Sequence, residues 1–178
     1  MNDRILEAFL QRQFEEGMAL ANASDLLRLA PLDGPVPQHY VAEFLCTGLV
    51  MPHTGRVDEA NLFHVGIYFP PDYLRRANPA QVLTWLGPPT IFHPNVRCYD
   101  RSTGIGAICV GRLTPGLHLV DLLYQCFEVI TYNKVTMRED DALNHAACIW
   151  ARQNKSRFPI DRRPLKCGYR DPQIEKVV

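Results

Sequence analysis

The sequence has no excess of charge of either sign. Its 19 Lys and Arg residues balance 19 Asp and Glu residues, so the formal net charge is zero. A protein whose main partner is duplex DNA is usually more basic, and we expect no specific nucleic acid as a partner. No apolar run reaches the roughly 18 residues that a membrane span requires, and the N-terminus lacks the apolar core of a signal peptide. These absences predict a cytoplasmic chain without a membrane partner.

Motifs of several enzyme classes are missing as well. The chain contains no internal repeat, phosphate-binding loop, dinucleotide fingerprint or metal-ligand spacing, so we expect neither a metal nor a cofactor. The six cysteines include no Cys-x-x-Cys pair. Without an export signal, these thiols should stay free in a reducing compartment. The question is then which thiol is reactive and which ones are packed.

What the chain does have is enough apolar character for a core. The apolar share of its 178 residues is 47%, which excludes a wholly disordered chain, and the length fits one domain. We divide the sequence into a folded domain over 1–154 and a basic, proline-containing tail over 155–178. The tail is interpreted either as a loosely packed terminus or as a contact for an acidic partner or RNA, although no aromatic stacking pattern supports nucleic acid.

Hydrophobic periodicity predicts an α+β domain. Apolar residues every four positions, from Leu6 to Met18, indicate an N-terminal helix, with Asp3 as its N-cap. Apolar runs bounded by turn residues predict strands over 26–30, 40–50, 62–69 and 81–86, joined as an antiparallel meander. Two further helices are predicted over 119–130 and 143–150, the second capped by Asp140 or Asp141. Cys126 and Cys148 fall on or beside their apolar stripes, which predicts packed thiols.

The chemistry is expected in the irregular, Gly- and Pro-rich segment 87–116, because long irregular segments in compact domains are usually functional. Cys109 lies there among small residues, in Gly-Ile-Gly-Ala-Ile-Cys-Val-Gly over 104–111. Residues 91–96 read Ile-Phe-His-Pro-Asn-Val, and carboxylates occur at 139–141. A thiol nucleophile, an amide donor and a carboxylate suit acyl transfer.

Together these motifs resemble the ubiquitin-conjugating enzymes. The similarity covers the segments 69–73 (Phe-Pro-Pro-Asp-Tyr), 91–96, 107–109 (Ala-Ile-Cys), 113–119 and 140–144. It extends in element order from about residue 4 to about residue 153. The resemblance implies a ubiquitin-conjugating-enzyme-like fold: an N-terminal helix, a four-stranded antiparallel meander, an active-site loop segment and two following helices.

The resemblance also implies a reaction. Cys109 would accept ubiquitin or a ubiquitin-like protein as a thioester from an activating enzyme and transfer it to a lysine of a protein substrate. Asn95 would donate its amide to the oxyanion or hold the loop that shapes the site, supported by His93 and Pro94. Asp141, with Asp140 as the neighbouring candidate, would orient and help deprotonate the lysine.

Partner surfaces follow from the same resemblance. The polar side of the first helix, with Arg4 and Arg12, would bind the activating enzyme. Leu74, Arg75 and Pro115 mark the surface where a ligase docks in the family, but residues 74–76 (Leu-Arg-Arg) lack the aromatic residue of many members.

Several features depart from the family pattern and indicate a divergent member, with a bacterial homologue as one interpretation. The stretch between Asn95 and Cys109 is unusually long, and its extra residues 97–102 could cover the site or bring a second thiol near it. Gly111 stands where an acidic residue is common, the usual tryptophan after the cysteine is absent, and no C-terminal helices are apparent after Phe158.

Other interpretations stay open at this point. Asn95 could be a turn residue, Asp141 a helix cap and Cys109 an inert thiol. The whole chain could be a non-catalytic ubiquitin-binding variant of the fold, although such variants lack the cysteine. It could also be an unrelated cysteine hydrolase that uses Cys109 with His93 or His118 as the base.

Overall fold

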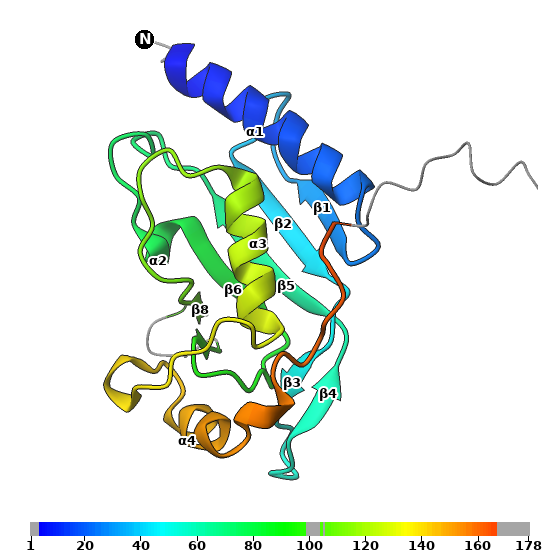
Figure 1. Cartoon of the computed structure of the whole chain (residues 1–178). Coiled ribbons are helices and arrows are strands. Elements are labelled where there is room, and N and C mark those ends of the chain that lie inside the picture. The colour runs from blue at the N-terminus through cyan, green and yellow to red at the C-terminus, as the bar shows by residue number, and fades with distance from the viewer. Residues whose placement is uncertain (1–3, 99–103, 105, 167–178) are drawn as a thin grey trace, which may run out of the picture.

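The computed structural model describes residues 4–98, 104 and 106–166. The chain forms an α+β fold around a four-stranded antiparallel sheet with the order β1-β2-β5-β6 (Figure 1). These strands are β1 (Leu27–Pro31), β2 (His39–Phe44), β5 (Phe63–Tyr68) and β6 (Leu83–Gly87). Consecutive strands of this sheet pair with one another, so the predicted antiparallel meander is confirmed.

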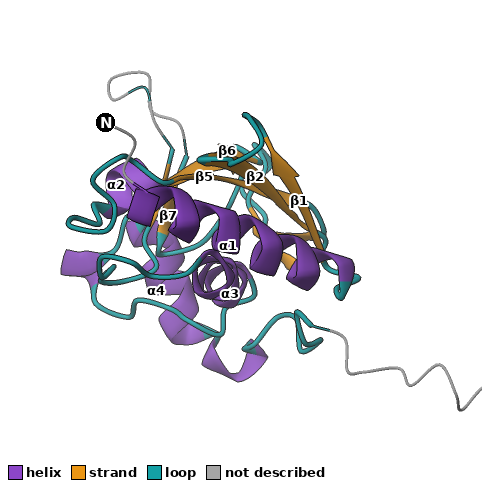
Figure 2. Ribbon diagram, turned by 90° about the horizontal axis from the view of Figure 1, so that it is seen from above, coloured by secondary structure: helices purple, strands orange, loops and turns teal. Residues whose placement is uncertain are grey.

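Helices cover one face of the sheet. Figure 2 shows α1 (Arg4–Asn22) and α3 (Leu119–Ile130) lying against it, with α4 (His145–Gln153) beyond α3. Alternate sheet residues, including Ala42, Val65 and Trp85, point into the main hydrophobic core beneath them. The helix predicted at the N-terminus and the one over 119–130 are both confirmed, whereas the proposed cap Asp3 lies outside the described residues. No helix in the described part of the chain is long and apolar enough to span a membrane.

The predicted strand over 40–50 is in fact two strands. After β2 the backbone leaves the sheet, because the N–H of Thr47 donates to the carboxylate of Asp161 at 2.8 Å. The chain continues as β3 (Gly48–Val50), which pairs with β4 (Asp58–Ala60) in a separate two-stranded sheet. A Cβ at Gly48 would lie 2.7 Å from the ring of Phe63, so only glycine fits at the start of β3.

The start of the last predicted strand is also different. Residues Pro79–Val82 form a short helix, α2, and β6 begins only at Leu83. Asn78 caps α2 by accepting a hydrogen bond from the N–H of Ala80 at 3.1 Å, and proline follows the cap directly. Both are helix-start signals, and they outweigh the strand tendency of the apolar residues that follow.

A second, smaller hydrophobic cluster lies under the end of α3. It consists of Leu49, Phe92, Tyr132, Ala147 and Ala151, with Trp150 and Phe158 packed against it. Tyr132 has a positive φ of 62°, a conformation that is uncommon for an aromatic residue. Its hydroxyl donates to the carbonyl oxygen of Phe92, so this residue ties the chain after α3 to the segment that precedes His93.

The segment 158–165, which we call the C-terminal strap, is packed on this body. The N–H of Ile160 donates to the carbonyl of Thr131 at 2.8 Å, and Leu165 is 1% exposed. Ser24 at the end of α1 donates to the carbonyl of Leu165. The first part of the predicted tail, 155–166, therefore belongs to the folded body, and residues 167–178 lie outside the described residues.

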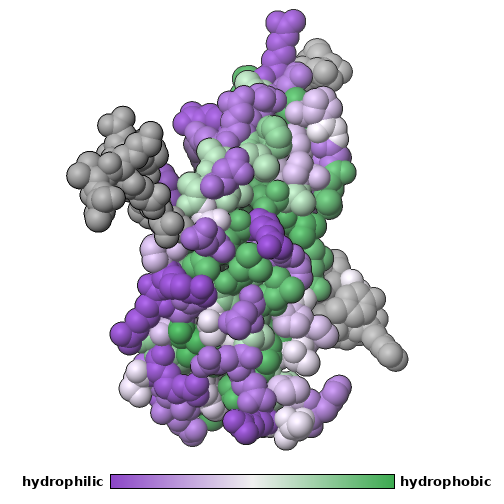
Figure 3. All heavy atoms as spheres, turned by 90° about the vertical axis from the view of Figure 1, so that its right-hand side faces the viewer, coloured by the Kyte–Doolittle hydropathy of each residue, from purple (hydrophilic) through white to green (hydrophobic). Residues whose placement is uncertain are grey.

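Hydrophobic residues also reach the surface. Figure 3 shows the face on the right of Figure 1, where they form a band along the middle that hydrophilic residues border on both sides. The large side chains that are exposed in the described part of the chain include Ile5, Leu32 and Leu86.

Candidate active site

Cys109 directly follows a small antiparallel hairpin. The hairpin consists of β7 (Val96–Arg97) and β8 (Ala107–Ile108), with Val96 opposite Ile108. The pairing extends one residue further, because the N–H of Cys109 donates to the carbonyl of Asn95 at 2.8 Å. Cys109 is half-buried, between a fully buried Val110 and a buried Ile108.

Asn95 is bound at both ends of its side chain. Its Nδ2 donates to the carbonyl oxygen of Cys109 at 3.0 Å, and its Oδ1 accepts from the N–H of Thr136 at 2.8 Å. The residue is 4% exposed. The amide therefore joins three chain segments: its own turn, the backbone of Cys109 and the segment of Thr136.

His93 fixes the turn that carries Asn95. Its Nδ1 accepts from the N–H of Asn95 at 3.0 Å, and its ring lies 4.2 Å from that of Tyr132. The imidazole is fully buried, and burial lowers its pKa to about 3. Since Nδ1 accepts a hydrogen bond, the proton of the neutral ring is on Nε2, which has no hydrogen-bond partner among the described residues. His93 is thus a neutral, buried support.

Pro94 connects the turn to the segment before α4. Its carbonyl accepts from the N–H groups of Leu143 at 2.8 Å and Asn144 at 3.2 Å. The chain just after Asp140 and Asp141 is therefore anchored beside the turn that holds the thiol.

The acidic segment does not cap α4, contrary to the sequence-based prediction. Residues 139–141 form a short 3-10 turn of their own, and Asn144 is the cap, accepting from the N–H of Ala147 at 3.0 Å. Asp140 and Asp141 remain 83% and 61% exposed in their side chains, and both carboxylates lie near Arg138, at 3.6 and 3.5 Å.

The other described thiols differ from Cys109. Cys46, Cys126 and Cys148 are buried, which confirms the packed thiols predicted for the helices, and burial raises the pKa of Cys46 and of Cys126 to about 12. Cys98 is half-buried, donates to the carbonyl of Pro89, and has a pKa that burial raises. Residues 99–102 of the long insertion lie outside the described residues, as does Cys167.

No model of a known protein family matches this chain, and no curated protein matches it.

The residues expected to bind partners lie on α1 and on two neighbouring loops. Arg4 and Arg12 are exposed on α1, where Arg12 pairs with Glu16 at 2.6 Å. Leu74 lies 3.8 Å from a Cβ built on Gly116, which brings Leu74 and the exposed Arg75 next to the loop of Pro115. The neighbouring Tyr73 donates to the carbonyl of Leu117 at 2.8 Å.

One charged neighbour of the thiol was not predicted from the sequence. Lys134 donates from its Nζ to the carbonyl oxygen of Val110. Its own N–H is held by the carbonyl of Glu128 at the end of α3, at 2.9 Å. A lysine after a helix C-terminus is unremarkable in sequence, since cations are common there, and no local pattern indicates this contact.

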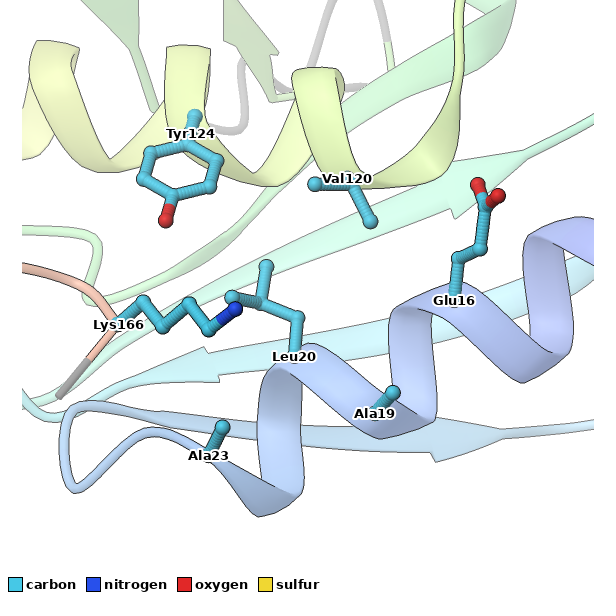
Figure 4. A pocket seen from close by; sticks show the side chains of 7 residues that line it. All are labelled: Glu16, Ala19, Leu20, Ala23, Val120, Tyr124 and Lys166. Carbon is cyan, nitrogen blue, oxygen red and sulfur yellow. The ribbon is translucent and has the colours of Figure 1, made fainter. Parts of the chain in front are cut away.

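Two hollows lie away from Cys109. One, of about 320 Å³, is formed by α1, α3 and Lys166, which directly follows the strap (Figure 4). Glu16 and Lys166 lie at its opposite ends in Figure 4, with Leu20 and Val120 between them. The other, of about 200 Å³, lies on the sheet beside Leu86. Neither is lined by a residue of the candidate site. Among the described residues, no group of three or more His, Cys, Asp or Glu side chains could hold a metal ion.

Proposed function

We propose that the chain is a ubiquitin-conjugating-type enzyme. Cys109 accepts the C-terminal acyl group of ubiquitin or a ubiquitin-like protein as a thioester and passes it to a lysine amine of a protein substrate. The observation that carries the proposal is the double tie between Asn95 and Cys109. A backbone bond at 2.8 Å and a side-chain bond at 3.0 Å fix the backbone of a half-buried thiol.

Two acyl transfers make up the reaction. In charging, the sulfur of Cys109 attacks the carbonyl of the thioester on the activating enzyme. A new C–S bond forms, the donor's C–S bond breaks, and the donor sulfur takes up the proton that Cys109 loses. In discharge, the lysine nitrogen attacks the same carbonyl, a C–N bond forms, the C–S bond to Cys109 breaks, and the amine proton is returned to the sulfur.

The fold supports this proposal through its element order. A helix, an antiparallel meander, an irregular segment that contains the thiol and two helices follow one another, as in the ubiquitin-conjugating fold. The contacts of Pro94 with Leu143 and Asn144 support a place for Asp141 near the thioester. Because its carboxylate is exposed and Asn144 caps the helix, Asp141 is available to an incoming amine.

A cysteine hydrolase fits the same residues less well. Such an enzyme needs an imidazole held against the sulfur. The Nδ1 of His93 is bound to the backbone of Asn95, and the whole ring is buried. The Nδ1 of His118 lies 3.1 Å from the carboxylate of Glu16 on α1. Transfer from a thioester needs less help from a base, because the acyl group arrives already activated.

The proposal extends to partners and source. An activating enzyme would contact α1 through Arg4 and Arg12, and a ligase would contact the surface of Leu74, Arg75 and Pro115. The departures from the family pattern, such as Gly111, fit a divergent bacterial homologue whose activating enzyme and ubiquitin-like protein are encoded beside it.

Charging tests the proposal directly. The chain is mixed with ATP and either ubiquitin and its activating enzyme or the corresponding pair encoded by neighbouring genes. A thiol-sensitive adduct on Cys109 is expected. Cys109→Ser should give at most an oxygen ester that thiols do not cleave, and Cys109→Ala should give no adduct, whereas Cys98→Ala should charge normally. An unchanged adduct on Cys109→Ala would overturn the assignment.

Asp141 is tested through discharge of the purified thioester to free lysine across pH. Asp141→Asn should charge normally and discharge more slowly, and the defect should shrink at high pH, where more of the lysine is already neutral. Asp140→Asn is the matched variant: a defect found only there would move the role by one residue. Wild-type profiles for both variants would remove the carboxylate from the mechanism.

A further inference from the structure

Lys134 meets the backbone on the C-terminal side of Cys109. Its Nζ donates to the carbonyl oxygen of Val110. The same nitrogen lies 3.4 Å from a Cβ built on Gly111, so the ammonium is packed against two consecutive residues after the thiol. Gly111 has a φ of +98°, and the chain turns away there.

The base of this side chain is itself held in place. The N–H of Lys134 donates to the carbonyl of Glu128 at 2.9 Å, which fastens the residue to the end of α3. Val135 packs against the second hydrophobic cluster, and the N–H of Thr136 donates to Asn95. The segment 134–136 is therefore anchored to α3 and to the second cluster. It makes two hydrogen bonds to the site, one from Lys134 and one from Thr136.

Hydrogen bonds therefore hold the backbone both at Cys109 and at the residue after it. Asn95 binds the N–H and the carbonyl of Cys109, and Lys134 binds the next carbonyl, that of the fully buried Val110. Bonds to a charged donor are shorter and stronger than neutral ones. Without Lys134, the Val110 carbonyl would lose the side-chain donor that the structure gives it.

We propose that Lys134 is a positioning residue for acyl transfer at Cys109. It clamps the Val110 carbonyl and so holds the second peptide unit after the thiol, while Asn95 holds the peptide units on either side of Cys109. This inference rests on the proposed function. It predicts that loss of the clamp lowers the rate of the chemical step and leaves the binding of the acceptor unchanged.

Single-turnover discharge of the Cys109 thioester to free lysine tests the inference. Lys134→Met keeps the apolar stem and removes the donor. We expect its maximal rate to fall about tenfold, with the half-saturating lysine concentration unchanged, because small misplacements of reacting groups can cost up to about 10²-fold in rate. Lys134→Arg keeps a charged donor and should recover most of the loss. Lys155→Met, at an exposed lysine of the 3-10 turn after α4, should behave as wild type in discharge rate and in unfolding midpoint.

Hydrogen exchange separates this inference from the proposed function. The amides of residues 110–112 should exchange faster in Lys134→Met than in wild type or Lys155→Met, whether or not any acyl group is carried. Unchanged exchange, or a wild-type discharge rate in Lys134→Met, would overturn the positioning role. A wild-type chain that accepts no acyl group would instead overturn the proposed function, and the exchange result would still decide whether the clamp exists.

Discussion

Asn95 uses the two ends of its amide in opposite senses, one as a donor and one as an acceptor. Asn95→Asp has nearly the same shape but replaces the donor to the Cys109 carbonyl by a second acceptor. We expect this variant to lose about 1–3 kcal/mol of stability and to be slow in both charging and discharge, because the backbone of the thiol is no longer held. Denaturant unfolding and single-turnover kinetics measure the two effects. Asn78→Asp, which keeps a good helix cap, is the control, and equal behaviour of the two variants would contradict the role of Asn95.

The buried imidazole of His93 should make the fold sensitive to acid. Burial lowers its pKa to about 3, whereas an exposed imidazole titrates near 6.5. Between these values the unfolded chain takes up a proton that the folded chain does not. The stability that the neutral, buried imidazole contributes to the fold is therefore fully present above about pH 6.5. It falls toward pH 3 by on the order of 1.4 kcal/mol per pH unit.

Urea unfolding between pH 7 and pH 4.5 checks this prediction for His93. The stability of the wild-type chain should fall with acid more steeply than that of His93→Gln, which cannot titrate there. His53→Gln, at an exposed turn, should keep the wild-type slope. Parallel curves for wild type and His93→Gln would show that the imidazole is not buried as described.

The hairpin before Cys109 is placed by contact with β6. The N–H of Trp85 donates to the carbonyl of Gly106 at 3.1 Å, and a Cβ on Gly106 would lie 2.2 Å from the carbonyl oxygen of Trp85. Because this oxygen belongs to the backbone of a sheet strand, it cannot move aside as a flexible side chain could. The strand β8 is therefore held at a distance that only glycine permits.

Gly106→Ala should push β8 away from the sheet. We expect a loss of about 1–3 kcal/mol of stability, as for other overpacked sites, together with slower charging of Cys109. Gly66→Ala is the matched variant, since the atom nearest to its Cβ would be the end of the flexible Leu86 side chain, at 3.4 Å. Thermal unfolding and charging kinetics of the pair measure the difference. Equal stabilities would mean that β8 can shift without cost.

Local patterns in the sequence predicted most of the elements. The strands and the helices around Leu6 and Leu122 follow from apolar periodicity, which acts over a few residues. The break after Phe44 depends on Asp161, more than a hundred residues away, and could not be predicted locally. At α4 the prediction of Asp140 or Asp141 as the cap was wrong, because residues 139–141 form a turn of their own and Asn144, an equally suitable residue type, caps the helix.

In the candidate site, too, local motifs could be predicted and long-range contacts could not. The positions of His93, Asn95 and Cys109 could be proposed from short motifs. The supports of the site come from Tyr132, Lys134 and Thr136, which reach it across the fold through hydrogen bonds between a side chain and the backbone. Any donor of suitable length could serve in such contacts, so the sequence carries no distinctive pattern for them.

The C-terminal strap joins both hydrophobic clusters and the end of α1. Phe158 lies 4.7 Å from the ring of Tyr132, and Leu165 belongs to the main core. Between them is Asp161, whose burial would raise its pKa, but hydrogen bonds from Arg163 and from the N–H of Thr47 lower the pKa to about 2. The strap therefore contributes to folding along its whole length.

Shortening a single strap side chain tests this contribution. Leu165→Ala should cost about 2–5 kcal/mol, as for other buried leucines, when measured by denaturant unfolding. Leu32→Ala, at a side chain that is 63% exposed, should change stability by no more than about 0.5 kcal/mol. If Leu165→Ala behaved like the control, residues beyond 154 would be a tail and no part of the fold.

The two hydrophobic clusters also give the molecule two built-in optical reporters. The sequence contains two tryptophans: Trp85 lies in the main core, and Trp150 packs against the smaller cluster beneath His93, with the guanidinium of Arg157 5.3 Å from its ring. Their fluorescence can be recorded one at a time in Trp85→Phe and Trp150→Phe. During unfolding, the sheet and the smaller cluster can thus be followed separately within the same chain. If the cluster around Tyr132 loosens before the sheet is lost, the two emission signals will change at different points.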